Sequence, residues 1–198
     1  MIFATFYTMG SPYAEYAAAW AKSLDRLGLR YVALGIPPCT WKEAVMQTGE
    51  MCQSACRAYP EEVVVFTDVD SEIVRYPYLL TCLPGDKDYD IGVYHLDPGG
   101  RFANPPGSRE LVNSVVVVWP TDLGRAVVSE WHRLNTTDRD ARCADQWNLE
   151  LAIKNLPAAR VFELPNEYCW IADMSEERFG KLDPVIIQHQ ASRKYGRT

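Results

Sequence analysis

Apolar and polar residues alternate along this chain in blocks that predict strands and helices in turn. Short apolar runs rich in valine, isoleucine and phenylalanine are typical of buried strands, and longer blocks with alanine, leucine and tryptophan at helical spacing are typical of helices. In the first part of the chain the strands are predicted at 1–7, 30–36 and 62–68, and the helices at 13–28 and 41–59. This order predicts a mostly parallel sheet covered on both faces.

The remainder of the chain mixes strands and helices less regularly. Further strands are predicted at 89–96, 110–119 and 184–190, and helices at about 122–134 and 144–154. The predicted fold class is therefore α/β, with a mixed, mostly parallel sheet flanked by helices. In such sheets, ligands bind outside the carboxyl ends of the strands.

Length and composition change this picture little. The 198 residues are expected to form a single domain, 47% of them are apolar, and the formal net charge is −6. The acidity argues against binding of nucleic acids or anionic membranes by charge alone. The six cysteines lack the paired spacing of a zinc site, no signal peptide is recognised, and the apolar stretches are too short to span a bilayer. A cytoplasmic protein with reduced thiols and no membrane span is expected.

The stretch "VVVFTDVDSEIV" at 63–74 carries the strongest chemical signal. Asp68 and Asp70 follow a buried strand with one residue between them, and two carboxylates so close together repel each other. A divalent cation, Mg²⁺ or Mn²⁺, would compensate that charge. The alternative is a turn at the strand end in which both side chains accept hydrogen bonds from backbone amides.

His189 ends the last predicted strand, in "PVIIQHQASRK", and is followed by Arg193 and Lys194. Imidazole is an acceptable ligand for Mn²⁺, and the two cationic side chains are suited to a phosphate. A lone histidine is also commonly a structural residue that makes hydrogen bonds, so both interpretations stay open.

Two further polar pairs stand at the starts of predicted elements. Asp145 and Gln146 begin a helix, where the acid either stabilises the helix N-terminus or meets sugar hydroxyls in a cleft. Asn113 and Ser114 begin a very apolar strand, where they either form a strand-entry turn or contact a ligand.

In this order the motifs resemble those of the GT-A-fold, metal-dependent glycosyltransferases of the glycogenin and lipopolysaccharide galactosyltransferase type. The resemblance covers nearly the whole chain. It is carried by "FYTMGSPYAEYAAAWAKSL", "VVFTDVDSEIV", "LVNSVVVVWP", "DQWNLELAI", "FELPNEYCW" and "VIIQHQ". It implies one GT-A-like domain over 1–198, with a nucleotide-binding half at about 1–75 and an acceptor and sugar half at about 76–198.

The resemblance also implies a function and a set of roles. It implies transfer of a sugar from a nucleotide-diphospho-sugar, expected to be a UDP-sugar, with retention of configuration. The acceptor is open between a saccharide, a protein, a small molecule and a modified nucleic-acid base. The implied metal ligands for Mn²⁺ or Mg²⁺ are Asp68, Asp70 and His189. The other implied donor contacts are Thr8, Gly10, Tyr13, Asn113, Ser114, Arg193 and Lys194, and the implied catalytic residues are Asp145 and Gln146.

The sequence departs from the family pattern at three points. Val115 stands where the family has glycine, and "ASRK" replaces the glycine- and lysine-containing phosphate clamp after the histidine. Arg57 is the candidate for a basic residue that the family supplies before the aspartate pair. These departures leave open a nucleotide-sugar-binding protein without turnover. A second alternative is a haloacid-dehalogenase-type phosphatase with Asp68 as nucleophile, because that class also carries Asp-x-Asp after an apolar strand.

Overall fold

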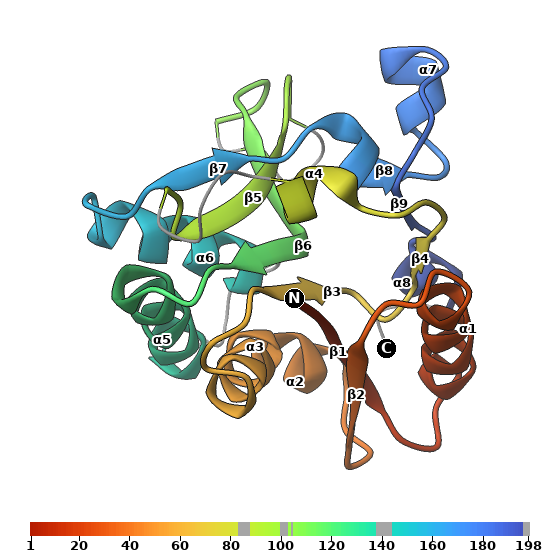
Figure 1. Cartoon of the computed structure of the whole chain (residues 1–198), viewed down its shortest axis with the longest axis horizontal. Helices are drawn as coiled ribbons and strands as arrows, with labels where there is room; N and C mark the ends of the chain where they lie inside the picture. The colour runs from red at the N-terminus through yellow and green to blue at the C-terminus, as the bar shows by residue number, and fades with distance from the viewer. Residues whose placement is uncertain (83–87, 100–102, 104, 138–143, 196–198) are drawn as a thin grey trace.

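The main sheet of the computed structural model has six strands in the part of the chain that is described, residues 1–82, 88–99, 103, 105–137 and 144–195 (Figure 1). In spatial order these strands are β2 (Tyr31–Ile36), β1 (Ile2–Thr8), β3 (Val64–Thr67), β6 (Glu110–Val118), β5 (Ile91–Leu96) and β7 (Val161–Glu163). A smaller sheet contains β4 (Ser71–Ile73), β9 (Ile186–Gln188) and β8 (Trp170–Ile171).

The strand directions confirm the predicted fold class. β1 runs parallel to β2 and β3, and β5 runs parallel to β7, whereas β6 is antiparallel to both β3 and β5. Because β6 lies between β3 and β5, the two predicted halves of the chain share one sheet.

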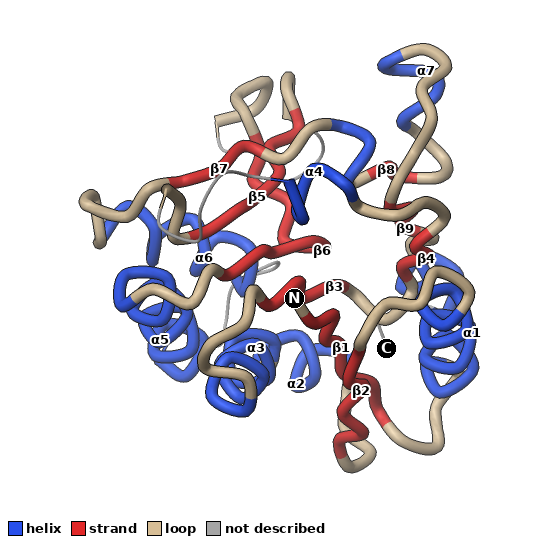
Figure 2. Tube along the Cα trace, viewed as in Figure 1, coloured by secondary structure: helices blue, strands red, loops and turns tan. Residues whose placement is uncertain are grey.

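Helices cover both faces of this sheet (Figure 2). The helices of the described residues are α1 (Tyr13–Asp25), α2 (Trp41–Met46), α3 (Thr48–Ala58), α4 (Tyr78–Cys82), α5 (Asp122–Thr137), α6 (Ala144–Asn155), α7 (Ser175–Phe179) and α8 (Ala191–Tyr195), with a 3₁₀ turn at Asn166–Tyr168. One buried cluster joins the sheet to α3, α5 and α6, and a second joins its other face to α1 and the small sheet. Among the described helices, none combines the length and the apolar character needed to cross a membrane.

The single helix predicted over 41–59 is wrong, because the chain forms two helices that meet at Gln47. The backbone tightens there: the Gln47 N–H donates to the carbonyl of Ala44 at 2.9 Å, and the Thr48 hydroxyl donates to the carbonyl of Val45 at 2.6 Å. Threonine hydroxyls that bond to a preceding carbonyl commonly bend helices. The local hydrogen bonding thus overrides a continuous helical pattern.

Asp90 joins three strands at the edge opposite the aspartate pair. Its buried carboxylate accepts hydrogen bonds from the backbone N–H of Arg160 at 2.8 Å, from the Arg160 guanidinium at 3.0 and 3.1 Å, and from the Thr121 hydroxyl at 2.7 Å. Its backbone carbonyl accepts from Trp119. These bonds, led by the one from Arg160, lower the pKa of Asp90 to about 2.

Replacing Asp90 by alanine is expected to lower the free energy of unfolding by about 2 kcal/mol, because it removes the buried carboxylate that accepts the hydrogen bonds of Arg160 and Thr121. Since the pKa falls from 3.8 to about 2 on folding, this carboxylate stabilises the wild type above about pH 4. That contribution is lost as the pH falls through about 2. Urea unfolding of both proteins at several pH values measures the difference, which should shrink toward acid pH.

Asp183→Ala is the matched control, because the Asp183 carboxylate is 91% exposed and lies 4.0 Å from Arg75. Its removal should change the unfolding free energy by less than about 0.5 kcal/mol. Equal effects of the two substitutions would contradict the role given to Asp90.

Candidate active site

The carboxyl end of β3 is fixed by its neighbours before the two aspartates begin. The Thr5 hydroxyl on β1 donates to the carbonyl of Thr67 at 2.8 Å, and the Trp20 indole on α1 donates to the Thr67 hydroxyl at 2.8 Å. All three residues are buried. Hydrogen bonds from β1 and α1 therefore hold the residue that precedes Asp68 in place.

Asp68 and Asp70 lie in the turn between β3 and β4, and both are half-buried. The Asp68 N–H donates to the carbonyl of Ser114 at 3.0 Å, and one Asp70 carboxylate oxygen accepts from the Ala191 N–H at 2.5 Å. The alternative to a metal site, a turn in which both carboxylates accept hydrogen bonds from backbone amides, is thus present only in part. The amide that Asp70 accepts from lies on α8, far away in sequence.

The electrostatics of this turn are unfavourable to two free carboxylates. Burial and then the charge of Asp70 raise the pKa of Asp68 to about 8, with Asp145 adding to the effect. Burial also raises the pKa of Asp70, against the hydrogen bond from Ala191. A cation bound between the carboxylates would remove this cost, so the two side chains fit a divalent metal ion.

His189 lies beside Asp70 through its backbone. β9 pairs with β4, with Gln188 opposite Ser71, and the His189 N–H donates to the carbonyl of Asp70 at 3.1 Å. Its imidazole Nε2, however, lies 3.3 Å from the carboxylate of Glu72. Within the described residues, no three His, Cys, Asp or Glu side chains form a metal-binding group. The structure thus places His189 next to the aspartates in the backbone but directs its ring to Glu72.

A cleft of about 390 Å³ opens at the aspartates between β1, α1 and α2. Four residues predicted from the sequence line it: Thr8, Tyr13, Asp68 and Asp70. Gly10 shapes the turn that leads into this wall, with a φ of +70° that favours glycine. The cleft thus brings an aromatic side chain and two carboxylates to one ligand-sized space.

Sequence reasoning missed part of this cleft. Trp41 at the start of α2, Cys39 and Ser192 also line it. A signal for Trp41 was present: Thr40 and Glu43 form a capping box, in which the Glu43 N–H donates to the Thr40 hydroxyl and the Glu43 carboxylate accepts from the Thr40 N–H. That box fixes the helix start directly after β2, at the same sheet edge as Asp68.

Asn113, Ser114 and Asp145 form a polar group beside Asp68. Asn113 donates from its side-chain amide to the Asp145 carboxylate at 2.6 Å, and a hydrogen bond from Ser114 favours the ionised form of Asp68. Burial raises the pKa of Asp145 to about 6, against the hydrogen bond from Asn113. The antiparallel β6 therefore brings Asn113 and Ser114, two of the predicted donor contacts, to the end of β3, where Asn113 meets Asp145 of α6.

Gln146 lies apart from that group. Its amide donates to the buried carboxylate of Glu110 at 3.1 Å, and it lines a different cavity, of about 280 Å³. Consecutive side chains on a helix point about 100° apart, so Asp145 and Gln146 diverge. The structure therefore does not bring the two predicted catalytic residues to the same space.

The remaining predicted contacts are distributed around the site. Lys194 is exposed and lines a wider groove with His189 and Glu72. The side chain of Arg193 is not part of what the structure describes. Val115 is fully buried in the core beneath the cleft, so its side chain does not line it. Arg57 is exposed at the end of α3 and is not among the residues that line the cleft.

Comparison with known proteins shows which solved structures share this architecture. No model of a protein family matches the sequence, and no curated protein matches it. Among solved structures, a glycosyltransferase involved in glycosylation of the major capsid of PBCV-1 is similar, with a TM-score of 0.73, 12% identity and coverage of 98% of this chain and 95% of that one.

Two other glycosyltransferases are similar in structure. GlyE of Streptococcus pneumoniae TIGR4 has a TM-score of 0.61 and 13% identity, over 94% of this chain and 53% of GlyE. The galactosyltransferase LgtC, in complex with donor and acceptor sugar analogs, has a TM-score of 0.51 and 12% identity, over 100% and 92% of the two chains. The chain thus has the GT-A type of glycosyltransferase fold, as its motifs predict.

Replacing Asp68 by asparagine is expected to stabilise the metal-free protein, because it removes one of three neighbouring carboxylates without changing side-chain size. In excess chelator the melting temperature should rise by about 2 to 4 °C, which corresponds to about 1 kcal/mol for a chain of this length. Thermal unfolding in chelator and in Mn²⁺ measures the effect.

The exposed Asp183→Asn serves as the control for lost negative charge, with a change of less than about 1 °C expected. A lower melting temperature for Asp68→Asn in chelator would show that the carboxylate stabilises the fold and is not held at a cost.

Proposed function

We propose that this protein is a glycosyltransferase that takes a sugar from a nucleotide-diphospho-sugar, with a UDP-sugar as the expected donor. One observation carries the proposal: in a GT-A-type fold, Asp68 and Asp70 share a single cleft with Tyr13 and Trp41. Aromatic rings suit a nucleobase, and a carboxylate pair suits a metal-bound diphosphate. The fold favours glycosyl transfer over the phosphatase interpretation of the aspartate pair.

The nucleotide would lie along the cleft from α1 and α2 toward the aspartates. Tyr13 and Trp41 come from the starts of two different helices and line the same space, so a base has aromatic surface available from both. Stacking of a base on one aromatic ring contributes about 1–3 kcal/mol. Thr8 and Ser192 add polar groups near the ribose and phosphates.

Asp68 and Asp70 are the residues that would hold a divalent metal ion, Mn²⁺ or Mg²⁺. When bound, the metal supplies charge that stabilises the nucleoside diphosphate as it leaves the sugar. To become a third metal ligand, the ring of His189 would have to break its contact with Glu72. That contact joins two half-exposed side chains. Lys194 is close enough to this region to contribute positive charge.

Asp145 and Asn113 would face the donor sugar. As the bond to phosphate breaks, the sugar acquires oxocarbenium character, and a neighbouring carboxylate favours that charge. Asn113 holds the Asp145 carboxylate by a hydrogen bond of 2.6 Å, so the orientation of the acid is set before a ligand arrives. Retention of configuration is part of the proposal through the family resemblance only.

Uridine diphosphate is expected to raise the melting temperature strongly with Mn²⁺ or Mg²⁺ present and only weakly in excess chelator. Asp70→Asn should abolish the metal-dependent part, because it removes one of the two carboxylates that would bind the ion. Thermal shift with each combination of nucleotide, metal and chelator measures both effects.

Asp183→Asn again provides the control, since it removes an exposed carboxylate that does not line the cleft and should respond like the wild type. Equal stabilisation by uridine diphosphate in chelator and in Mn²⁺ would rule out a metal-dependent donor site.

Asp145→Asn is expected to keep the fold and the affinity for uridine diphosphate, because asparagine still accepts the hydrogen bond from Asn113. Turnover should nevertheless fall by roughly 100-fold or more, since the lost charge acts mainly as the sugar becomes positive. Release of nucleoside diphosphate from a screen of nucleotide-sugars, with and without acceptor, measures the rate.

Asp122→Asn is the matched control: Asp122 is also acidic and in the first turn of a helix, but its side chain is fully exposed. A folded Asp145→Asn with full hydrolysis and transfer rates would assign Asp145 to helix stabilisation. Donor binding without any turnover in the wild type would favour the nucleotide-sugar-binding alternative.

A further inference from the structure

A second cavity, of about 280 Å³, opens at the same edge of the main sheet as the donor cleft. Its walls include Arg109, Glu110, Gln146, Trp147 and Glu150. β6 begins at this edge, because it runs antiparallel to β3, and β5 and β7 end there. The cavity and the donor cleft thus lie beside neighbouring strand ends of the same sheet.

The first turn of α6 stands between the two spaces. Asp145 faces Asn113, and Gln146 faces Glu110 on the same strand. Asp145 and Gln146 are consecutive in the chain, so their Cα atoms lie only about 3.8 Å apart. A molecule in the second cavity would therefore lie within reach of a sugar held at Asp145.

The walls of the cavity carry both hydrogen-bond donors and acceptors in fixed positions. Glu110 is 6% exposed and Gln146 is 8% exposed, and their side chains bond to each other at 3.1 Å. At the rim, the Lys154 ammonium lies 2.6 Å from the Glu150 carboxylate. Trp147 adds a half-buried aromatic side chain to this polar surface.

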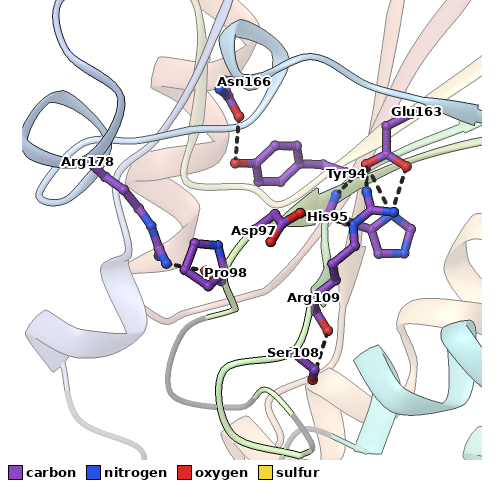
Figure 3. A network of polar contacts seen from close by, with 9 residues as sticks. All are labelled: Tyr94, His95, Asp97, Pro98, Ser108, Arg109, Glu163, Asn166 and Arg178. Atoms are coloured by element: carbon purple, nitrogen blue, oxygen red, sulfur yellow. Dashed lines mark hydrogen bonds and ion pairs between the residues drawn. The ribbon is translucent and has the colours of Figure 1, made fainter.

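Arg109 is held in place by a network on the outer side of the cavity (Figure 3). Its guanidinium donates to the Glu163 carboxylate at 2.6 Å, and the His95 Nδ1 lies 3.0 and 3.1 Å from the two oxygens of that carboxylate. Asp97 lies 3.8 Å from the Arg109 guanidinium. Exposed ion pairs of this kind contribute about 0–1 kcal/mol each, so together they favour this orientation of Arg109 without adding much stability.

We propose that this cavity binds a saccharide, which serves as the acceptor; the assignment as acceptor rests on the proposed function. Carboxylate, amide and guanidinium groups together offer both the donors and the acceptors that vicinal hydroxyls require. The volume lies just below the roughly 300–1,000 Å³ of drug-sized ligand pockets, so it suits about one sugar ring. A nucleic-acid acceptor is disfavoured because its phosphates would meet the carboxylates of Glu110 and Glu150.

Saccharide binding is tested on the full chain by saturation-transfer NMR, with glucose, galactose, N-acetylglucosamine, lactose and maltose as probes. Each is measured with uridine diphosphate and Mn²⁺ and again without them. At least one saccharide should give a signal, and Trp147→Ala and Glu110→Gln should each weaken its binding tenfold or more. Glu130→Gln, which alters a half-buried carboxylate paired with Arg133 on α5 and outside the cavity walls, should bind as the wild type does.

The two variants are also compared in donor hydrolysis without acceptor. Uridine diphosphate affinity and hydrolysis should stay within about twofold of the wild type, and circular dichroism confirms that the variants fold. No saccharide binding, or binding that survives both substitutions, overturns the inference. Saccharide binding without release of nucleoside diphosphate from any donor would instead overturn the proposed function and leave the cavity as a saccharide site.

Discussion

The pairing of β6 with β3 is the contact on which the candidate site depends. Thr67 lies opposite Val115, and the next hydrogen bond of the ladder joins the Asp68 N–H to the carbonyl of Ser114. This single register sets Asn113 and Ser114 beside the aspartate turn. A shift by one residue would turn Asn113 away from Asp145 and exchange the residues that pack on the two faces of the sheet, because side chains alternate between the two faces of a strand. The register is therefore fixed by the core and serves the site.

The price of this arrangement is a concentration of carboxylates at one sheet edge. Burial raises the pKa of Asp68, Asp70 and Asp145 alike, and each is opposed by at least one hydrogen bond. Asp90 is a contrasting case in the same fold: its buried carboxylate accepts hydrogen bonds from Arg160 and Thr121, which offset the cost of burying its charge. Acidic groups are thus stabilised where they join strands and left unfavourable where a ligand would bind.

The first turn of α6 divides the chemistry between two spaces. Asn113 orients the Asp145 carboxylate on the side of the proposed donor site. Glu110 orients Gln146, which lines the second cavity. The Trp131 indole donates to the carbonyl of Asp145 at 2.6 Å and anchors the turn. A helix start held from both β6 and α5 cannot easily rotate. The proposed donor and acceptor sites would therefore keep a fixed geometry relative to each other.

The sequence alone predicted five of the six strands of the main sheet, its main flanking helices and four of the residues that line the cleft at the aspartates. Apolar runs mark the central strands because these bury both faces, and Thr8, Tyr13, Asp68 and Asp70 stand at element ends, which such sheets bring to one edge. Only the tertiary structure decided the antiparallel direction of β6, the break at Gln47, the entry of Trp41 into the cleft, the contact of His189 with Glu72 and the separation of Gln146 from Asp145. These depend on side-chain direction and on contacts between distant segments. A pattern of residue types along one chain records which elements form, but not which neighbours each side chain meets.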